Sequence, residues 1–180
     1  MKIIIFGPPG AGKGTFSAMI EEDYGLHLFV MGDELRAARD EGGEFAERLK
    51  KTIGTGNLVD DECLLDLVRS KLVGVEKFIL DGFPRTIPQC TFLDSIFGNA
   101  IDAFIDLQVD ESVLVDRLMN RGRSDDTEEV IVNRMRVFKT QTAPVWKYLK
   151  ARTRHIQIDG NGPIDDVYGA IRSGLDKITS

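Results

Sequence analysis

The residues best suited to chemistry stand near the start of the chain, in the run GPPGAGKGT at residues 7–15. Between a strand and a helix, such a glycine-rich loop turns backbone N–H groups toward phosphate oxygens, and the helix adds its positive N-terminal end. Lys13 stands where a phosphate-binding loop carries the lysine that reaches the outer phosphates of a nucleotide. Gly14 departs from this pattern, because it replaces the hydroxyl residue that contacts magnesium, and Thr15 follows one position late. A simple strand–helix turn would need neither the lysine nor so many glycines, so we interpret the run as a phosphate loop.

Asp81 is the candidate for the metal contact that Gly14 cannot make. It follows the apolar run 78–80, and a carboxylate at the end of that strand would reach the phosphates across the edge of the sheet. An aspartate after a strand is more often a turn or cap residue. Beside a phosphate loop, we favour a role in holding magnesium.

Three motifs follow one another along the chain: GPPGAGKGT, then DGFPRTIPQ at residues 81–89, then RGRSDD at residues 121–126. Together they resemble the motifs of adenylate kinases and related nucleoside monophosphate kinases, and the resemblance covers essentially the whole chain. That family carries GKGT in its phosphate loop. The resemblance therefore implies a genuine loop whose magnesium is held by the nucleotide and by water, with Asp81 acting through water.

On the donor side, the resemblance implies that Lys13 is the catalytic loop lysine. Arg121, Arg123 and Arg134 match arginines that act on the donor and on the transferring phosphate, and we count them as catalytic together with Arg85. The implied ATP-binding positions are Gly10, Ala11, Gly12, Lys13, Gly14, Thr15, Arg117 and Arg121.

On the acceptor side, the resemblance implies that Arg36 and Arg85 hold the phosphate of AMP, and that Gln89 reads the adenine edge. The implied AMP-binding positions are Met31, Arg36, Val59, Gly82, Arg85 and Gln89. These arginines suit phosphoryl transfer, which requires phosphates held in line and developing charge neutralised. Without the resemblance, any one of them would be interpreted as a solvated surface charge.

Two departures from the family bear on function. Members that use AMP usually carry threonine at the position of Met31, and a thioether replaces that hydrogen bond poorly. The predicted lid is very short, since only Gly122 separates Arg121 from Arg123. It has no room for the zinc-binding lid of some bacterial members, so we expect magnesium with ATP and no structural zinc.

Apolar runs alternate with helical periodicity along the chain, which predicts an α/β fold with a parallel sheet. The predicted strands are 3–6, 28–30, 78–80, 103–109 and 155–158. The predicted helices lie near 13–23, 33–53, 60–73, 88–96, 111–121, 127–150 and 164–178. Pro144 should kink or divide the helix near 127–150. We therefore expect a doubly wound, phosphate-loop NTPase-type fold: a five-stranded parallel sheet flanked by helices, with an acceptor-binding insertion and a short lid.

The 180 residues are expected to form a single kinase domain. Its core would comprise residues 1–30, 60–120 and 127–180. The acceptor-binding insertion would span 31–59, and the lid 121–126.

The formal net charge of −6 argues against general affinity for nucleic acid or anionic membranes. The two cysteines, far apart in sequence, suit a reducing cytoplasm. No basic leader or membrane-spanning run is evident. We expect a cytoplasmic monomer whose partners are ATP, AMP and ADP. His27 and His155 have no evident ligand partners, and Trp146 is interpreted as a packing residue.

The leading functional hypothesis is an adenylate kinase that reversibly converts MgATP and AMP to two ADP. A UMP or CMP kinase is the nearest alternative, although such relatives usually carry asparagine at the position of Thr86. A non-catalytic nucleotide-binding regulator would be expected to lose Lys13 or the arginines, and all are present. A phosphate-loop ATPase would have no use for the acceptor arginines and Gln89.

Overall fold

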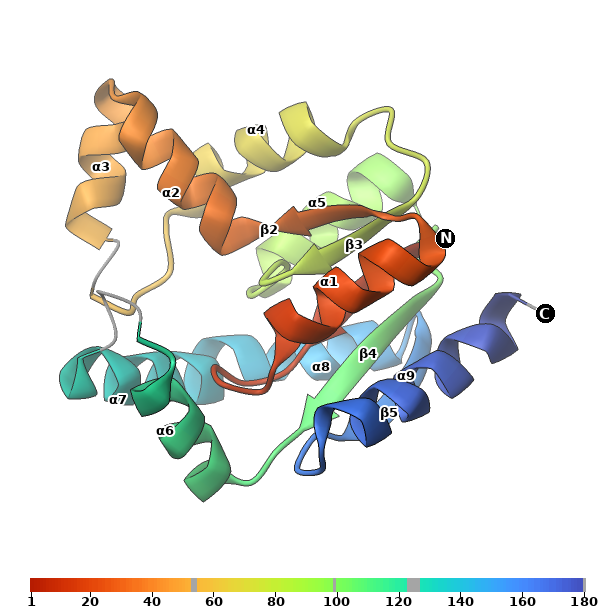
Figure 1. Cartoon of the computed structure of the whole chain (residues 1–180). Coiled ribbons are helices and arrows are strands. Elements are labelled where there is room, and N and C mark those ends of the chain that lie inside the picture. Colours follow the sequence, from red (N-terminus) through yellow and green to blue (C-terminus); the bar gives the residue numbers. More distant parts are fainter. Residues whose placement is uncertain (53–54, 99, 123–126, 180) are drawn as a thin grey trace.

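The structure is a computed structural model of the chain, and it describes residues 1–52, 55–98, 100–122 and 127–179 (Figure 1). Within these ranges, parallel strands form one five-stranded sheet in the order β2-β3-β1-β4-β5. The strands are β1 (Lys2–Phe6), β2 (His27–Val30), β3 (Phe78–Asp81), β4 (Ala103–Gln108) and β5 (Arg154–Asp159). The predicted five-stranded parallel sheet is confirmed.

The sheet has helices on both faces, and the central strand shows why (Figure 1). Ile3 and Ile5 of β1 lie in one apolar core together with residues of α1 (Lys13–Tyr24) and α9 (Ile164–Thr179). Ile4 and Phe6 lie in a second apolar core on the opposite face. The helices of that second face are α4 (Asp61–Leu72), α5 (Ile87–Phe97) and α8 (Ala143–Lys150). A strand that is buried on both faces has a continuously apolar sequence, as residues 3–6 have.

The connection after β1 leads to β2 on one side of the sheet, and the connection after β4 leads to β5 on the other. Neighbouring strands whose connections diverge in this way leave a crevice beyond their carboxyl ends, where ligands bind in open α/β sheets. The phosphate-loop sequence lies between β1 and α1, at this crevice.

Residues 31–59 begin directly at the end of β2. They contain α2 (Met31–Glu41) and α3 (Glu44–Thr52), which project from the sheet edge beside β2 in Figure 1. The prediction of one helical stretch near 33–53 is wrong. Gly42 and Gly43 separate the two helices, and both have the positive φ that ends a helix, 83° and 92°.

The long helical stretch after residue 127 is divided, as predicted. It comprises α7 (Glu128–Val137), a π-helical turn η1 (Phe138–Thr142) and α8, with Pro144 in the first turn of α8, where a missing N–H is tolerated. Before it, α6 (Glu111–Asn120) ends at the predicted lid. Only Arg121 and Gly122 of that lid lie within the described residues, so its boundaries and those of the insertion stay predictions.

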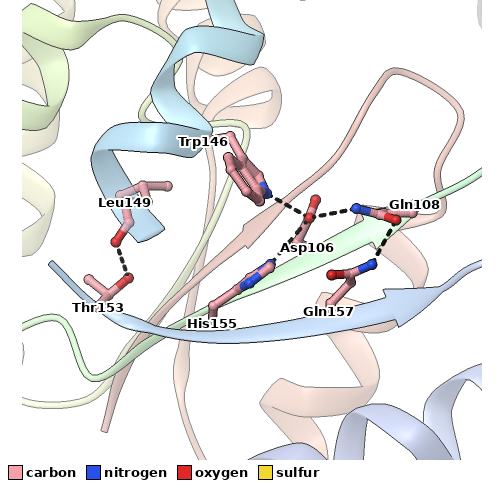
Figure 2. A network of polar contacts seen from close by, with 7 residues as sticks. All are labelled: Asp106, Gln108, Trp146, Leu149, Thr153, His155 and Gln157. Atoms are coloured by element: carbon pink, nitrogen blue, oxygen red, sulfur yellow. Dashed lines mark hydrogen bonds and ion pairs between the residues drawn. The ribbon is translucent and has the colours of Figure 1, made fainter. Parts of the chain in front are cut away.

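Under α8 lies a polar network that the sequence did not suggest (Figure 2). Asp106, on β4 and only 5% exposed, accepts hydrogen bonds from Trp146 Nε1 at 2.8 Å and from Gln108 Nε2 at 3.2 Å. His155 Nε2 lies 3.3 Å from the same carboxylate oxygen, and the imidazole stacks on Phe104. His155 therefore has a structural role in this network, and Trp146 both packs and donates a hydrogen bond.

No helix in the described ranges is long and apolar enough to span a membrane.

Candidate active site

A cleft of about 890 Å³ opens at the carboxyl edge of the sheet. It collects side chains and backbone from the β1–α1 loop, from α2, from the end of β3 and from α6 and α7. The predicted site residues that line it are Gly10, Gly12, Lys13, Gly14, Thr15, Met31, Arg36, Val59, Asp81, Gly82, Arg85, Gln89, Arg117, Arg121 and Arg134.

Two predicted site residues are not among those that line the cleft. The side chain of Ala11 is fully buried in the core beside α1, and its N–H donates to the carbonyl of Pro8 at 3.2 Å. Arg123 lies outside the described residues. Their predicted roles stay predictions.

The loop itself is shaped by glycine and packed from below by Phe16. Gly12 has a φ of +94°, and a Cβ at this position would stand 3.0 Å from the Phe16 ring, so the backbone conformation and the close contact both favour glycine. Lys13 Nζ donates to the carbonyl oxygens of Gly7 and Pro8, each at 2.9 Å. The ammonium group therefore lies against the loop whose backbone would surround a phosphate.

Asp81 is the last residue of β3 and is 7% exposed. One of its carboxylate oxygens lies 3.7 Å from the point where a Cβ of Gly14 would stand, so the carboxylate faces the start of α1. A carboxylate oxygen is the ligand type that Mg²⁺ prefers, and the position fits a shared role with a bound nucleotide. In the described part of the chain, no three histidine, cysteine, aspartate or glutamate side chains gather where they could hold a metal ion.

Arg85 lies on the same wall of the cleft, four residues after Asp81. Its Nε donates to the carbonyl of Gly82 at 2.7 Å, and a Cβ at residue 82 would meet Arg85 Nη2 at 2.8 Å, so the guanidinium folds across a glycine. The surrounding protein atoms replace part of the water around Arg85 and lower its pKa from the usual value; Asp81 raises this pKa and Arg134 lowers it. The group remains cationic, since arginine does not lose its proton in proteins.

Arg36 and Arg117 approach the cleft from opposite sides. On α2, Arg36 pairs with Asp33, and its guanidinium nitrogens lie 3.4 Å from the position of a Cβ at Gly32. On α6, Arg117 donates to the carbonyl of Gly160 at 3.0 Å, which holds its side chain beside the loop after β5. Cationic groups therefore border the cleft on both its α2 side and its α6 side.

Comparison with known proteins decides the family. A family model described as adenylate kinase matches residues 5–154. An adenylate kinase of Caulobacter sp. (strain K31) is 37% identical, covering 99% of this chain and all of the relative. One of Synechococcus sp. (strain WH7803) is 36% identical, covering 97% and 98%. One of Trichodesmium erythraeum (strain IMS101) is 40% identical, covering 99% and 100%.

The chain belongs to the adenylate kinase family. The predicted family is confirmed, and with it the enzyme class, nucleoside monophosphate kinase. The reaction of the family is reversible transfer of the terminal phosphoryl group of ATP to AMP, which gives two ADP.

The structure of this adenylate kinase family member adds two groups that sequence reasoning missed. Gly162, in the loop after β5, and Ile164, the first residue of α9, line the cleft on the side of Arg117. The signal was available, because a loop that leaves the carboxyl end of a strand next to β4 must border the same crevice.

The second addition is Asp61, at the start of α4. Gln89, which is 1% exposed, donates from Nε2 to Asp61 Oδ1 at 2.6 Å, while its Oε1 accepts from the backbone N–H of Arg85 at 2.6 Å. The predicted reader of the base is thus held by the protein at both ends of its amide. Nothing in the sequence spacing indicated this partner, because 28 residues separate the two.

Proposed function

We propose that the protein transfers the terminal phosphoryl group of MgATP to AMP, with the donor held by the phosphate loop and α6 and the acceptor by α2 and the end of β3. The observation that carries the proposal is the meeting in one cleft of the loop, Asp81 and arginines from α2, α6, α7 and the segment after β3. Phosphoryl transfer depends on positioning and charge neutralisation, and such a cleft can supply both.

On the donor side, Lys13 would leave the carbonyls of Gly7 and Pro8 and pair with the outer phosphates. Backbone N–H groups of the loop and the N-terminus of α1 would hold the phosphate oxygens. The guanidinium of Arg117, fixed by Gly160, would lie against the donor base, with Ile164 nearby. Arg121 and Arg134 would neutralise charge that develops on the transferring group.

On the acceptor side, Arg36 and Arg85 would hold the phosphate of AMP in line with the donor. The fork of a guanidinium pairs with two phosphate oxygens at once, which fixes direction as well as charge. Gln89 and the backbone near Val59 would read the base.

Magnesium would arrive with ATP and neutralise charge between its outer phosphates. We propose that Asp81 holds the ion through a water molecule. Gly14 lacks the hydroxyl of other phosphate loops, and with no side chain it leaves the space beside the carboxylate open.

The insertion at residues 31–59 would close over the acceptor and exclude water, which protects ATP from hydrolysis. Its last part is tied to α7, since Asn133 Nδ2 donates to the carbonyl of Thr55 at 2.6 Å. A bisubstrate analogue, two adenosines joined through five phosphates, should therefore slow hydrogen exchange in α2 and α3. Unchanged exchange in both helices would contradict closure.

We expect the enzyme to act as a cytoplasmic monomer.

A coupled assay with MgATP and a panel of AMP, dAMP, GMP, CMP and UMP tests the proposed acceptor. AMP should give the highest kcat/KM. A preference for CMP or UMP would reassign the enzyme to the pyrimidine kinases, and nucleotide binding without turnover would favour a regulator.

Arg36→Ala tests the acceptor side specifically. Losing a charge-assisted hydrogen bond of about 1.5–3 kcal/mol should lower kcat/KM for AMP by roughly tenfold or more, with ATP affinity preserved. Arg39→Ala is a matched control, because both arginines lie on α2, have side chains 34% exposed and pair with an aspartate, but Arg39 is not among the residues that line the cleft. Equal losses in the two variants would contradict the assignment of Arg36.

A further inference from the structure

Asp61 closes a ring of hydrogen bonds around the side chain of Gln89. Asp61 Oδ1 accepts from Gln89 Nε2 at 2.6 Å, and Asp61 Oδ2 accepts from the hydroxyl of Thr86 at 3.1 Å. That hydroxyl in turn accepts from the backbone N–H of Gln89 at 3.3 Å, as the N-cap of α5. On the other side, the N–H of Arg85 donates to Gln89 Oε1 at 2.6 Å.

The chemistry of these partners allows only one orientation of the Gln89 amide. An ionised carboxylate only accepts and a backbone N–H only donates, so the amide nitrogen must face Asp61 and the amide oxygen must face Arg85. A flipped amide would place acceptor against acceptor and donor against donor. The ring uses one N–H and one oxygen lone pair of Gln89, and one of each remains for a ligand in the cleft.

A fixed amide carries information about purine identity. The pairing edge of adenine offers an amino donor at C6 and an acceptor at N1. Hypoxanthine offers the reverse, a carbonyl acceptor at C6 and an N1–H donor. When arginines fix the phosphate and so the direction of the nucleotide, an amide of one orientation pairs twice with adenine and is mismatched twice with hypoxanthine.

We propose that Asp61 is a positioning residue that fixes the donor–acceptor order of Gln89 and thereby sets the preference for 6-aminopurine over 6-oxopurine acceptors. The proposal rests on the proposed role of Gln89 in reading the base. Capping of α5 does not by itself explain Asp61, because the hydroxyl of Thr86 already accepts the capping bond.

The test compares kcat/KM for AMP and for IMP, the nucleotide of hypoxanthine, in the wild type and in Asp61→Ala and Asp61→Asn. The AMP/IMP ratio should fall about tenfold in Asp61→Ala, the equivalent of one lost hydrogen bond, mainly through the KM for AMP. Asp61→Asn keeps an oxygen that can face Gln89, so the AMP/IMP ratio should fall less in this variant. It serves as the test if the alanine variant does not fold. Asp60→Asn, an exposed neighbour, should leave the ratio unchanged. A loosened cleft would lower both efficiencies together and leave the ratio intact, which would overturn the proposal.

Gln89→Ala separates the two levels of inference. If this variant keeps the wild-type ratio, the proposed role of Gln89 is wrong. If the AMP/IMP ratio falls in Gln89→Ala but stays at the wild-type value in both Asp61 variants, only the positioning role of Asp61 is wrong. In the Gln89→Ala background, Asp61→Ala should cause no further change in the ratio; a further change would show that Asp61 acts by another route and would overturn the proposal.

Discussion

Two buried aspartates flank the central strand, and they have opposite surroundings. Asp81 ends β3 and Asp106 lies near the end of β4, and their register partners on β1 are the adjacent residues Ile5 and Phe6. The two residues are about equally buried, at 7% and 5% exposed. One borders the cleft and faces the phosphate loop; the other lies beneath α8 among aromatic rings.

The difference is in what surrounds each carboxylate. Trp146, His155 and Gln108 surround that of Asp106, all from within the fold. Asp81 borders the cleft and interacts electrostatically with Arg85 on the same wall. Burial therefore does not identify a functional carboxylate. What separates the two is their surroundings: the carboxylate proposed to hold magnesium borders a cleft lined with arginines, and the other is enclosed by donors of its own fold.

Among the changes to residues that line the cleft, Lys13→Ala should lower turnover the most. Turnover should fall by at least about a hundredfold, the scale of losing one group that stabilises transition-state charge. The melting temperature should hold, because Lys13 belongs to neither apolar core. Lys139→Ala, which removes an exposed lysine paired with Glu111, is the control and should leave turnover unchanged. Near wild-type turnover in Lys13→Ala would exclude the proposed role of the loop.

Asp81→Asn should lower kcat by roughly ten- to a hundredfold, the scale of a lost charge-assisted interaction of about 1.5–3 kcal/mol. The magnesium concentration for half-maximal rate should rise, because the amide attracts a hydrated cation less than the carboxylate does. Thermal unfolding should change little, since this carboxylate borders the cleft. A loss of stability without a shift in the magnesium dependence would make Asp81 another structural aspartate.

Asp106→Asn should show the reverse pattern. Trp146, Gln108 and His155 all contact one carboxylate oxygen, Oδ2, so an asparagine can keep an acceptor there but loses the negative charge that strengthens these bonds. We expect a loss of about 1–3 kcal/mol in the free energy of unfolding and a melting temperature lower by a few degrees. Calorimetry should show the loss of stability, and the coupled assay should show little change in kcat. A large fall in kcat would place the network of Figure 2 in the catalytic machinery.

Local pattern predicted the sheet because each strand carries its own signal. Residues 3–6 are continuously apolar because both faces of β1 are covered, and the glycine-rich loop after them marks the crevice. Helix boundaries were less well predicted. The break between α2 and α3 at Gly42 and Gly43 was not predicted, since glycines inside a helical period do not reveal their φ.

The polar partners were missed for a different reason. Asp106 and His155 are 49 residues apart, and they meet because the register of β4 and β5 sets Phe104 opposite His155. Asp61 meets Gln89 because α4 and α5 pack side by side. Both pairs depend on strand register and helix packing, which a single sequence does not encode at any fixed spacing. Motif resemblance supplied residues that line the cleft but not the residues that hold them in place.

Met31→Thr should give the smallest effect on catalysis, and it tests the cleft wall next to Asp81. Met31 begins α2, is 2% exposed, and lies beside Gly82, the residue after Asp81. A threonine hydroxyl would add one neutral hydrogen bond to the base, about 0.5–1.5 kcal/mol, so the KM for AMP should fall by roughly two- to tenfold.

The same change should weaken the fold, because it removes apolar volume from the core that contains Met31. We expect a loss of about 2 kcal/mol in unfolding free energy, at the lower end for truncating a buried methionine. Met119→Thr, at an α6 position 55% exposed, should change neither quantity. Base preference is the most discriminating measurement: selection of AMP over CMP and UMP should sharpen in Met31→Thr. If the wild type prefers a pyrimidine or guanine acceptor and the variant does not move toward AMP, then Gln89 does not read adenine, and the acceptor wall of the cleft must be reassigned.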